Sequence, residues 1–223
     1  ANTLKFSFEE LDSIICAAVE NAKNARAHST AKQEKYIALD IGSLGKLLKP
    51  LGELDFEDAV KVFSQTVTLG VKYGVDLVLI ETMNDSYETK AAVLAAKENC
   101  DLPIFVTNVY DESKKLMTGA SPLAMISMLE GLRVDAIGIN CSLGPDKMLP
   151  LIERYYKASS LPIIANANAG LPSMVEGKAT YSLDAEKFAD YASLLAKAGA
   201  SILGGCCGTE PDYIKYVVKK THS

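Results

Sequence analysis

The sequence predicts an α/β fold in which parallel strands alternate with helices, and three observations support this prediction. Short apolar runs of strand length, rich in β-branched residues, alternate with segments of helical periodicity. The runs are apolar nearly throughout, as expected of parallel strands that are buried on both faces. Successive runs lie roughly 25–40 residues apart, a spacing that suits repeated βα units.

The elements can be assigned in chain order. A helix is expected first, over residues 8–27, because Leu11, Ile14, Ile15, Ala18 and Val19 share one stripe. Six strands are predicted, at 36–43, 76–81, 103–109, 136–142, 162–168 and 200–206. Between them, five helices are predicted at 56–73, 87–99, 122–130, 147–157 and 185–198. Helix starts are marked by Asp55, Ser121, Asp184 and Thr209, and Thr209 with Asp212 resembles a capping box.

The composition is that of a compact globular protein and argues against several classes of partner. The 223 residues are 48% hydrophobic, which is enough for one sizeable core. The formal net charge is −5 and no Lys/Arg-rich run stands out, so neither nucleic acid nor an acidic membrane surface is expected as a partner. No apolar stretch of transmembrane length and no signal peptide is recognised. Five cysteines, an odd number, predict a reducing compartment and hence a cytoplasmic protein.

Repeated βα units form either an open doubly wound sheet or a closed (β/α)₈ TIM barrel. The glycines do not fit a dinucleotide fingerprint, so nothing favours an open Rossmann sheet. Distinctive polar residues lie at the carboxyl ends of several strands, as in the active site of a barrel: Asp40, Glu81, Asn108, Cys141, Asn168, Cys206 and Cys207. The barrel is therefore predicted, although only six of its eight strands are counted.

Three of the cysteines are candidates for a zinc site with an open position. Cys141 closes the strand at 136–142, and Cys206 and Cys207 close the strand at 200–206. Side chains from next-but-one strands, about 10 Å apart, can converge on one ion at Zn–S distances of about 2.3 Å. Adjacent residues on a regular strand point to opposite faces, so both Cys206 and Cys207 can face the ion only if the backbone turns there. The neighbouring glycines, Gly204, Gly205 and Gly208, allow such a turn.

Two other interpretations of these cysteines stay open at this point, namely inert core thiols and a strained disulfide between Cys206 and Cys207. Cys16 and Cys100 are expected to be structural. If zinc is bound, three thiolates leave a fourth position for a substrate thiol, which zinc would help to deprotonate near neutral pH. An all-sulfur ligand set argues for alkylation of a thiol rather than for hydrolysis, because three thiolates make zinc a poor Lewis acid.

Five motifs along the chain are distinctive: Asp40-Ile41-Gly42-Ser43-Leu44-Gly45, Glu81-Thr82 with Glu88, Gly138-Ile139-Asn140-Cys141-Ser142, Asn168-Ala169-Gly170 and Gly204-Gly205-Cys206-Cys207-Gly208-Thr209. In these motifs the chain closely resembles the homocysteine S-methyltransferase family, and within it the homocysteine-binding domain of cobalamin-dependent methionine synthases. The similarity covers essentially the whole chain, and the last motif, paired with the Asn-Cys motif, is highly specific.

The resemblance implies a (β/α)₈ barrel with zinc held by Cys141, Cys206 and Cys207, which are thus both the metal ligands and the catalytic residues. It also implies substrate-binding roles for two other residues. Glu81 would hold the amino group of the substrate, with a structural ion pair as the alternative role. Asn168 would fill the fourth position before the substrate arrives. Asn140 is expected to act beside the ligands or to bond the backbone, rather than to ligate.

Against the family pattern, the first two strands are not found in this chain. The family's Asp-Gly motif of the first strand has no match, and Ala1-Asn2-Thr3 resembles the end of the second strand. We therefore expect residues 1–223 to be a barrel domain that is incomplete at its N-terminus, in a longer protein or beside a partner that covers two unpaired edges.

The resulting prediction is a methyltransferase that uses Zn²⁺ to methylate L-homocysteine, giving methionine. The donor is expected to be methylcobalamin charged from methyltetrahydrofolate, carried by separate cobalamin-binding and folate-binding domains or proteins. The alternatives are S-methylmethionine or another small methyl donor, a non-catalytic zinc-binding or homocysteine-binding fragment, and an unrelated barrel with coincidental cysteines.

Overall fold

The computed structural model describes residues 7–141, 144–175 and 178–221, which divide into two compact units. The first unit comprises Ala1–Glu81 and Tyr87–Phe105, and the second comprises Thr82–Ser86 and Val106–Ser223. Six strands follow one another in the order β1-β2-β3-β4-β5-β8, and a separate two-stranded sheet is formed by β6 and β7. The α/β class and the six predicted strands are therefore confirmed.

The first unit alternates helices and strands. It holds α1 (Phe8–His28), β1 (Ala38–Ile41), α2 (Phe56–Lys72), most of β2 (Leu77–Met83) and of α3 (Ser86–Asn99), and the start of β3 (Ile104–Asn108). The strands β1 and β2 pair in parallel, with Asp40 opposite Leu79. α1 begins at a capping box in which Ser7 and Glu10 bond each other's backbone N–H groups. Both α1 and β1 pack against α2, whose inner face buries Ala59, Phe63 and Val67.

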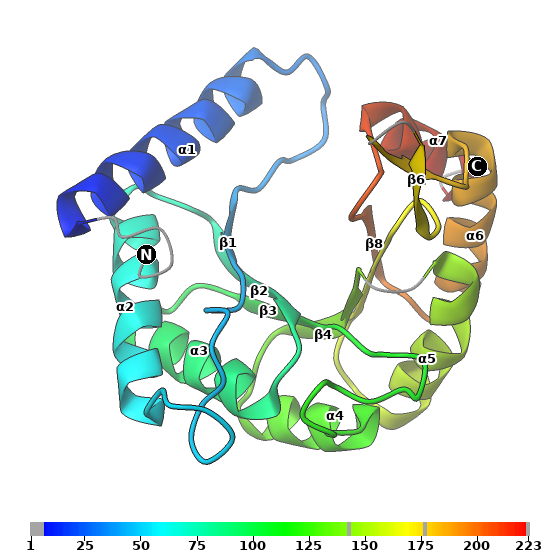
Figure 1. Cartoon of the computed structure of the whole chain (residues 1–223). Coiled ribbons are helices and arrows are strands. Elements are labelled where there is room, and N and C mark those ends of the chain that lie inside the picture. Colours follow the sequence, from blue (N-terminus) through cyan, green and yellow to red (C-terminus); the bar gives the residue numbers. More distant parts are fainter. Residues whose placement is uncertain (1–6, 142–143, 176–177, 222–223) are drawn as a thin grey trace. The chain divides into compact units, whose positions relative to one another are not determined.

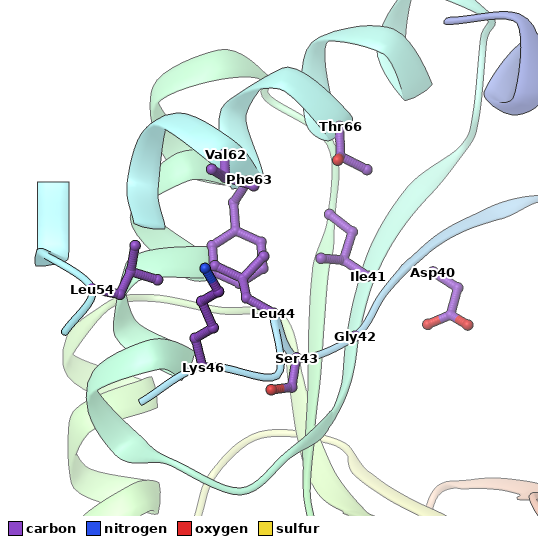
Figure 2. A pocket seen from close by; sticks show the side chains of 10 residues that line it. All are labelled: Asp40, Ile41, Gly42, Ser43, Leu44, Lys46, Leu54, Val62, Phe63 and Thr66. Carbon is purple, nitrogen blue, oxygen red and sulfur yellow. The ribbon is translucent and has the colours of Figure 1, made fainter. Parts of the chain in front are cut away.

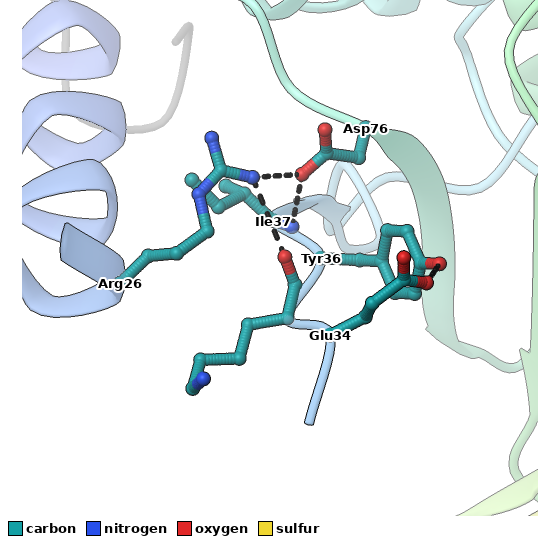
Figure 3. Close-up of polar contacts among 6 residues, drawn as sticks. Arg26, Glu34, Tyr36, Ile37 and Asp76 are labelled. Atoms are coloured by element: carbon teal, nitrogen blue, oxygen red, sulfur yellow. Dashed lines mark hydrogen bonds and ion pairs between the residues drawn. The ribbon is translucent and has the colours of Figure 1, made fainter. Parts of the chain in front are cut away.

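A single carboxylate joins the connection between α1 and β1 to the start of β2. The Asp76 Oδ2 atom accepts hydrogen bonds from the Ile37 backbone N–H at 2.6 Å and from Arg26 Nη1 at 2.7 Å (Figure 3). Arg26 also donates to the Lys35 carbonyl at 3.4 Å. Because Ile37 is buried, this contact supplies an acceptor for an N–H group that has little access to water.

The loop after β1 is held by another carboxylate, which is buried. Glu88 on α3 is only 1% exposed, and it accepts from the Ser43 hydroxyl at 2.8 Å and from the Leu44 backbone N–H at 2.6 Å. The same loop lines a pocket between β1 and α2, with Asp40, Lys46 and Thr66 among its lining residues (Figure 2).

The second unit repeats the same pattern and carries one insertion. Its elements are the end of β3, α4 (Pro122–Gly131), β4 (Ala136–Asn140), α5 (Pro145–Ala158), β5 (Ile163–Ala167), α6 (Ala185–Lys197), β8 (Ile202–Gly205) and α7 (Pro211–Thr221). The strand β5 pairs in parallel with β4 on one side and with β8 on the other. The helices α5 and α6 lie outside these strands (Figure 1). The buried side chains of the two helices include Met148, Leu151, Tyr155, Phe188 and Leu195.

The insertion between β5 and α6 is a β-hairpin that the sequence analysis does not predict. It consists of β6 (Pro172–Val175) and β7 (Lys178–Tyr181), which pair antiparallel with Pro172 opposite Tyr181. Gly170, with φ +92°, lies at its base, where a Cβ atom would come within 2.2 Å of Ser182 Oγ.

Most element boundaries agree with the prediction to within a few residues, but the proposed capping box at Thr209 is wrong. The helix α7 begins at Pro211, one residue too late for Thr209 to be its N-cap. The Thr209 hydroxyl instead donates to the Cys206 carbonyl at 2.8 Å.

Residues Ala1-Asn2-Thr3, on which the expectation of two missing strands rests, lie outside the described residues. The incomplete barrel domain over residues 1–223 therefore stays a prediction. Among the described helices, none combines the length and the apolar composition that a membrane span requires.

Candidate metal centre

The structure brings together the three predicted cysteines, all within the second unit. Cys141 directly follows β4, and Cys206 and Cys207 directly follow β8, the next strand but one. The three Sγ atoms lie within 4.8 Å of one another, and those of Cys141 and Cys207 are 3.7 Å apart. In the described part of the chain, this is the one group of at least three His, Cys, Asp or Glu side chains with metal-binding spacing.

The adjacent cysteines reach the same point because the backbone turns immediately after β8, as the sequence predicts. Cys206 still donates its N–H to the Ala167 carbonyl, at 2.8 Å, and so continues the pairing of β8 with β5. Cys207 and Gly208 then form a turn, and Gly208 has φ +80°, a conformation that glycine adopts without steric cost. The turn rotates Cys207 away from the alternation of the strand and toward Cys141.

The position of Cys207 is also fixed by Asn168. The Asn168 side chain is 4% exposed, and its Oδ1 atom accepts the backbone N–H of Cys207 at 3.0 Å. In this arrangement the amide oxygen of Asn168 supports the cysteine turn. That Asn168 fills the fourth ligand position before the substrate arrives stays a prediction.

Asn140 lies beneath the cysteines and makes four contacts. Its Oδ1 atom accepts from the Thr82 backbone N–H at 3.0 Å and from Thr107 Oγ1 at 2.9 Å. Its Nδ2 atom donates to Thr82 Oγ1 at 2.7 Å and to Cys206 Sγ at 3.8 Å. Asn140 is fully buried, and its amide contacts the sulfur of Cys206. Its expected role beside metal ligands stays a prediction.

Two residues of the site have backbone conformations that are rare for their types. Thr82 has φ +60° and Cys141 has φ +56°. A β-branched residue such as Thr82 is a steric outlier there, and such strain costs on the order of 1–3 kcal/mol. Because Asn140 bonds both the N–H and the hydroxyl of Thr82, and Cys141 donates its N–H to Asn166 O at 3.0 Å, the surroundings hold both residues in place.

The electrostatics of the three thiols favour a bound cation. The hydrogen bond with Cys141, followed by burial, raises the pKa of the Cys206 thiol. Burial, followed by the hydrogen bond with Cys141, raises the pKa of Cys207. Neighbouring sulfur atoms cannot all carry negative charge in the protein alone, because like charges at this distance repel. A cation among them would remove that cost.

The dimensions of the cluster fit zinc. Tetrahedral coordination at Zn–S distances of about 2.3 Å requires sulfur atoms about 3.8 Å apart. The distance of 3.7 Å between the Sγ atoms of Cys141 and Cys207 meets this requirement, and the other two Sγ–Sγ distances are at most 4.8 Å.

The two rival interpretations of the cysteines fit less well. No disulfide joins any of the five cysteines, all of which are described, and Cys207 is exposed, unlike an inert core thiol. Cys100, in contrast, donates to the Ala96 carbonyl at the end of α3, as a structural residue would.

Glu81, the other predicted substrate-binding residue, lies in the first unit. It is half-buried near the carboxyl end of β2, immediately before Thr82. Its predicted contact with the amino group of a substrate stays a prediction.

Sequence reasoning missed two residues beside the cysteines, Thr82 and Thr107, which bond the side-chain amide of Asn140. Thr82 lies in the Glu81-Thr82 motif, but what distinguishes it is its backbone conformation, which the sequence does not show. Tyr181, whose ring lies against Gly208 next to Cys207, was also missed, because the hairpin that carries it was not predicted.

Comparison with known proteins identifies the family of the chain. The family model described as homocysteine S-methyltransferase matches residues 2–221. The methionine synthase of Mycobacterium leprae (strain TN) is 31% identical over 195 residues, and that of Mycobacterium tuberculosis (strain ATCC 25618 / H37Rv) is 29% identical over 191. These alignments cover 85% and 83% of this chain but only 16% of either methionine synthase.

The fold is shared with a solved structure. The metallated form of the homocysteine methyltransferase MmuM from Escherichia coli superposes with a TM-score of 0.82 at 21% identity, covering 100% of this chain and 74% of MmuM. Its apo form gives a TM-score of 0.80, covering 97% of this chain and 75% of MmuM. Because the family model spans nearly the whole sequence, the chain belongs to the homocysteine S-methyltransferase family.

Proposed function

We propose that this chain carries the homocysteine-binding and zinc-binding part of an enzyme that methylates L-homocysteine to methionine. The observation that supports this most directly is the cluster of three thiols, whose spacing suits one zinc ion. Cys141, Cys206 and Cys207 would hold the ion. When bound, zinc would lower the pKa of a substrate thiol, so that the sulfur is nucleophilic near neutral pH.

The chain's own residues would arrange the ligands and the substrate. Asn140 and Asn168 hold the two strand ends that carry the thiols, through the contacts described above. In the transfer, the substrate sulfur loses its proton to solvent and forms a bond to the methyl carbon of the donor. The bond between that carbon and the donor breaks, and its electron pair stays with the donor. Glu81 is proposed to bind the ammonium group of the substrate and Asn168 to approach its sulfur.

The donor is proposed to be methylcobalamin charged from methyltetrahydrofolate, carried on another domain or protein. This is supported by the similarity to methionine synthases, of which the chain spans only 16%. A small donor such as S-methylmethionine is the alternative. Because the three thiols must be reduced to bind metal, a reducing compartment such as the cytoplasm is part of the proposal.

The first test measures the metal. Purified protein exposed to zinc and then desalted should hold one zinc per chain, and Cys207→Ser should hold markedly less. Cys100→Ser is the matched control, because the Cys100 thiol donates to the Ala96 carbonyl at the end of α3, and this variant should bind zinc as the wild type does. A wild-type protein that retains much less than one zinc, or a Cys207→Ser variant that retains it fully, would contradict the proposed site.

The second test measures methyl transfer by the zinc-loaded, full-length protein. Methionine should form from homocysteine and methylcobalamin, and formation from S-methylmethionine alone would instead identify the small donor. Glu81→Gln should raise the KM for homocysteine while leaving the zinc content unchanged, because a neutral amide binds ammonium less strongly than a carboxylate does. If zinc is bound but neither donor gives methionine, the non-catalytic alternative is favoured.

A further inference from the structure

The main chain of the two adjacent cysteines is hydrogen-bonded at each of its four polar groups. Cys206 donates its N–H to the neighbouring strand β5 at 2.8 Å, and its carbonyl accepts from Thr209 N at 3.2 Å and from Thr209 Oγ1 at 2.8 Å. The Cys207 N–H donates to Asn168 Oδ1 at 3.0 Å, and the Cys207 carbonyl accepts a backbone N–H from the segment after β5 at 2.9 Å. Two of these contacts are made by side chains, those of Asn168 and Thr209.

Thr209 closes the turn that presents Cys207. The bond from Thr209 N to the Cys206 carbonyl joins residues three apart, so residues 206–209 form a β-turn with Cys207 and Gly208 at its centre. This backbone bond is 3.2 Å long, whereas the bond from the Thr209 hydroxyl to the same carbonyl is 2.8 Å long. The side chain of Thr209 therefore makes the shorter of the two contacts that keep the turn closed.

The space for this hydroxyl depends on a glycine. A Cβ atom on Gly205 would lie 2.3 Å from Thr209 Oγ1, which is far inside the contact distance of the two atoms. Gly205 ends β8 and is not among the glycines with positive φ, so the site uses its missing side chain rather than an unusual backbone conformation. Any larger residue at position 205 would push the hydroxyl away from the Cys206 carbonyl.

A closed turn affects metal binding because Cys207 is the most exposed of the three thiols. Packing therefore contributes little to the position of its side chain, and the turn is what brings its sulfur to 3.7 Å from that of Cys141. When only a fraction of the molecules has a binding-competent arrangement, the apparent affinity for a ligand falls in proportion to that fraction. A contact that keeps the turn closed in the metal-free protein thus raises the affinity for metal.

We propose that Thr209 is a positioning residue of the metal centre, whose hydroxyl keeps the turn closed and so holds the Cys206 and Cys207 thiols ready for a metal ion. The conserved shape of the turn then depends on a pair, the Thr209 hydroxyl and the empty space at Gly205. This inference rests on the proposed function only in requiring that the cluster binds a metal ion; it does not depend on methyl transfer.

The test compares three variants at threonine positions. Thr209→Val keeps the shape of the side chain and removes its hydroxyl, whereas Thr209→Ser keeps the hydroxyl. Thr221→Val is the matched control, because the Thr221 hydroxyl also donates to a main-chain carbonyl, that of Val217 at 2.9 Å, but within α7. Zinc affinity is measured by competition with a chromophoric chelator, and circular dichroism of the zinc-free proteins checks that each variant is folded.

We expect Thr209→Val to bind zinc about 5-fold more weakly, which is the effect of one neutral hydrogen bond on an equilibrium. Thr209→Ser and Thr221→Val should bind zinc as the wild type does. The proposal is overturned if the affinity of Thr209→Val stays within twofold of the wild type. It is also overturned if Thr209→Ser or Thr221→Val weakens binding equally, because the hydroxyl at the turn would then not be the group that acts.

A second position tests the same contact and guards against a folding failure of Thr209→Val. Gly205→Ala keeps the Thr209 hydroxyl but fills its space, so it should weaken zinc binding in the same direction, and unchanged affinity would count against the proposal. In the Gly205→Ala background, Thr209→Val should change the affinity less than twofold further, because the contact is already lost. Losses that add in full would show that the two residues act independently, contrary to the proposal.

The proposed function and the role of Thr209 fail in different ways. Wild-type protein that binds zinc but makes no methionine would contradict the proposed function and leave the role of Thr209 standing. Wild-type protein that binds no zinc would overturn both.

Discussion

The side-chain amide of Asn140 has an oxygen, which accepts hydrogen bonds, and a nitrogen, which donates them. The neighbouring residues determine which of the two atoms faces the sulfur of Cys206. The backbone N–H of Thr82 can only donate, so the atom that faces it, at 3.0 Å, must be the amide oxygen. The amide nitrogen is thereby directed at the Thr82 hydroxyl and at Cys206 Sγ. A donor beside a thiolate stabilises its negative charge, so the orientation of this one amide favours a metal-binding sulfur.

Asn140→Asp should weaken zinc binding at least about tenfold, since it replaces that donor by a carboxylate oxygen of nearly the same shape. Competition with a chelator measures the affinity. Asn99→Asp is the matched control, because the Asn99 amide donates to the Ala95 carbonyl and to Ser64 Oγ rather than to a sulfur atom. It should leave zinc affinity unchanged. Unaltered zinc affinity in Asn140→Asp would show that the amide does not act on the sulfur.

The individual residues of the site differ in how visible they are in the sequence. Cysteines at strand ends can be recognised, because few other roles need thiols flanked by glycines. Asn140 and Asn168 could be assigned roles only through the family resemblance, because asparagine has many ordinary roles. Thr82 and Thr107 were found only in the structure, since threonine is equally common elsewhere and Thr82 takes part through a φ of +60°, which no residue type reveals.

At the scale of elements, Asp76 links three segments of the first unit. Asp76 lies just before β2. Its carboxylate accepts hydrogen bonds from Arg26, near the end of α1, and from the backbone N–H of Ile37, the residue before β1. The ion pair is partly exposed, with about a third of each side chain accessible, so its Coulombic contribution is screened. The hydrogen bond to the Ile37 N–H group is harder for water to replace than the ion pair is, because Ile37 is buried.

Two substitutions separate these contributions. Arg26→Ala should lower the free energy of unfolding by at most about 1 kcal/mol, since only the screened pair is lost. Asp76→Ala should cost about 2–3 kcal/mol, because it also leaves the Ile37 N–H without its acceptor. Urea denaturation measures both, and Lys61→Ala, which breaks an exposed pair with Asp58, should have little effect. Equal costs for Arg26→Ala and Asp76→Ala would assign the stabilisation to the ion pair instead.

The elements that sequence patterns predicted are those with their own periodicity. The helices and the six parallel strands have apolar patterns long enough to recognise. The hairpin strands have only four residues each. Met174 of β6 and Leu171 just before it are exposed, so the side chains whose burial is described here form no buried apolar stripe. The hairpin is stabilised by contacts distant in sequence, such as Tyr181 on Gly208, which a local pattern does not contain.

For the molecule as a whole, the strand order follows the chain order through β5, with each strand beside the next one in the sequence, as in repeated βα units. This order could be predicted because each strand is followed by a helix that returns the chain to the same end of the sheet. Closure into a full barrel stays a prediction, because it depends on pairing between strands far apart in the sequence, which no local pattern encodes.

Metal binding should stabilise the whole chain. A ligand at 100 times its Kd that binds only the folded state adds about 2.7 kcal/mol, and for a chain of this size each kcal/mol raises Tm by about 2–4 °C. Removing zinc with a chelator should therefore lower Tm by roughly 5–10 °C, measured by calorimetry. Cys207→Ser should melt at the same temperature with and without zinc. A wild-type Tm that does not change when the chelator is added would contradict the proposed stabilisation by the metal.

The thiols lie close in space but far apart along the chain. About 65 residues separate Cys141 from Cys206, and a metal ion bound to both would close that stretch into a loop, for which the chain-entropy treatment of cross-links gives about 4 kcal/mol. The loop holds α5, β5, the hairpin, α6 and β8. A zinc ion bound for the reaction would therefore also make these elements unfold less often, and an unfolded segment is what proteases cleave. The supply of zinc in the cell would then help to set the lifetime of the protein.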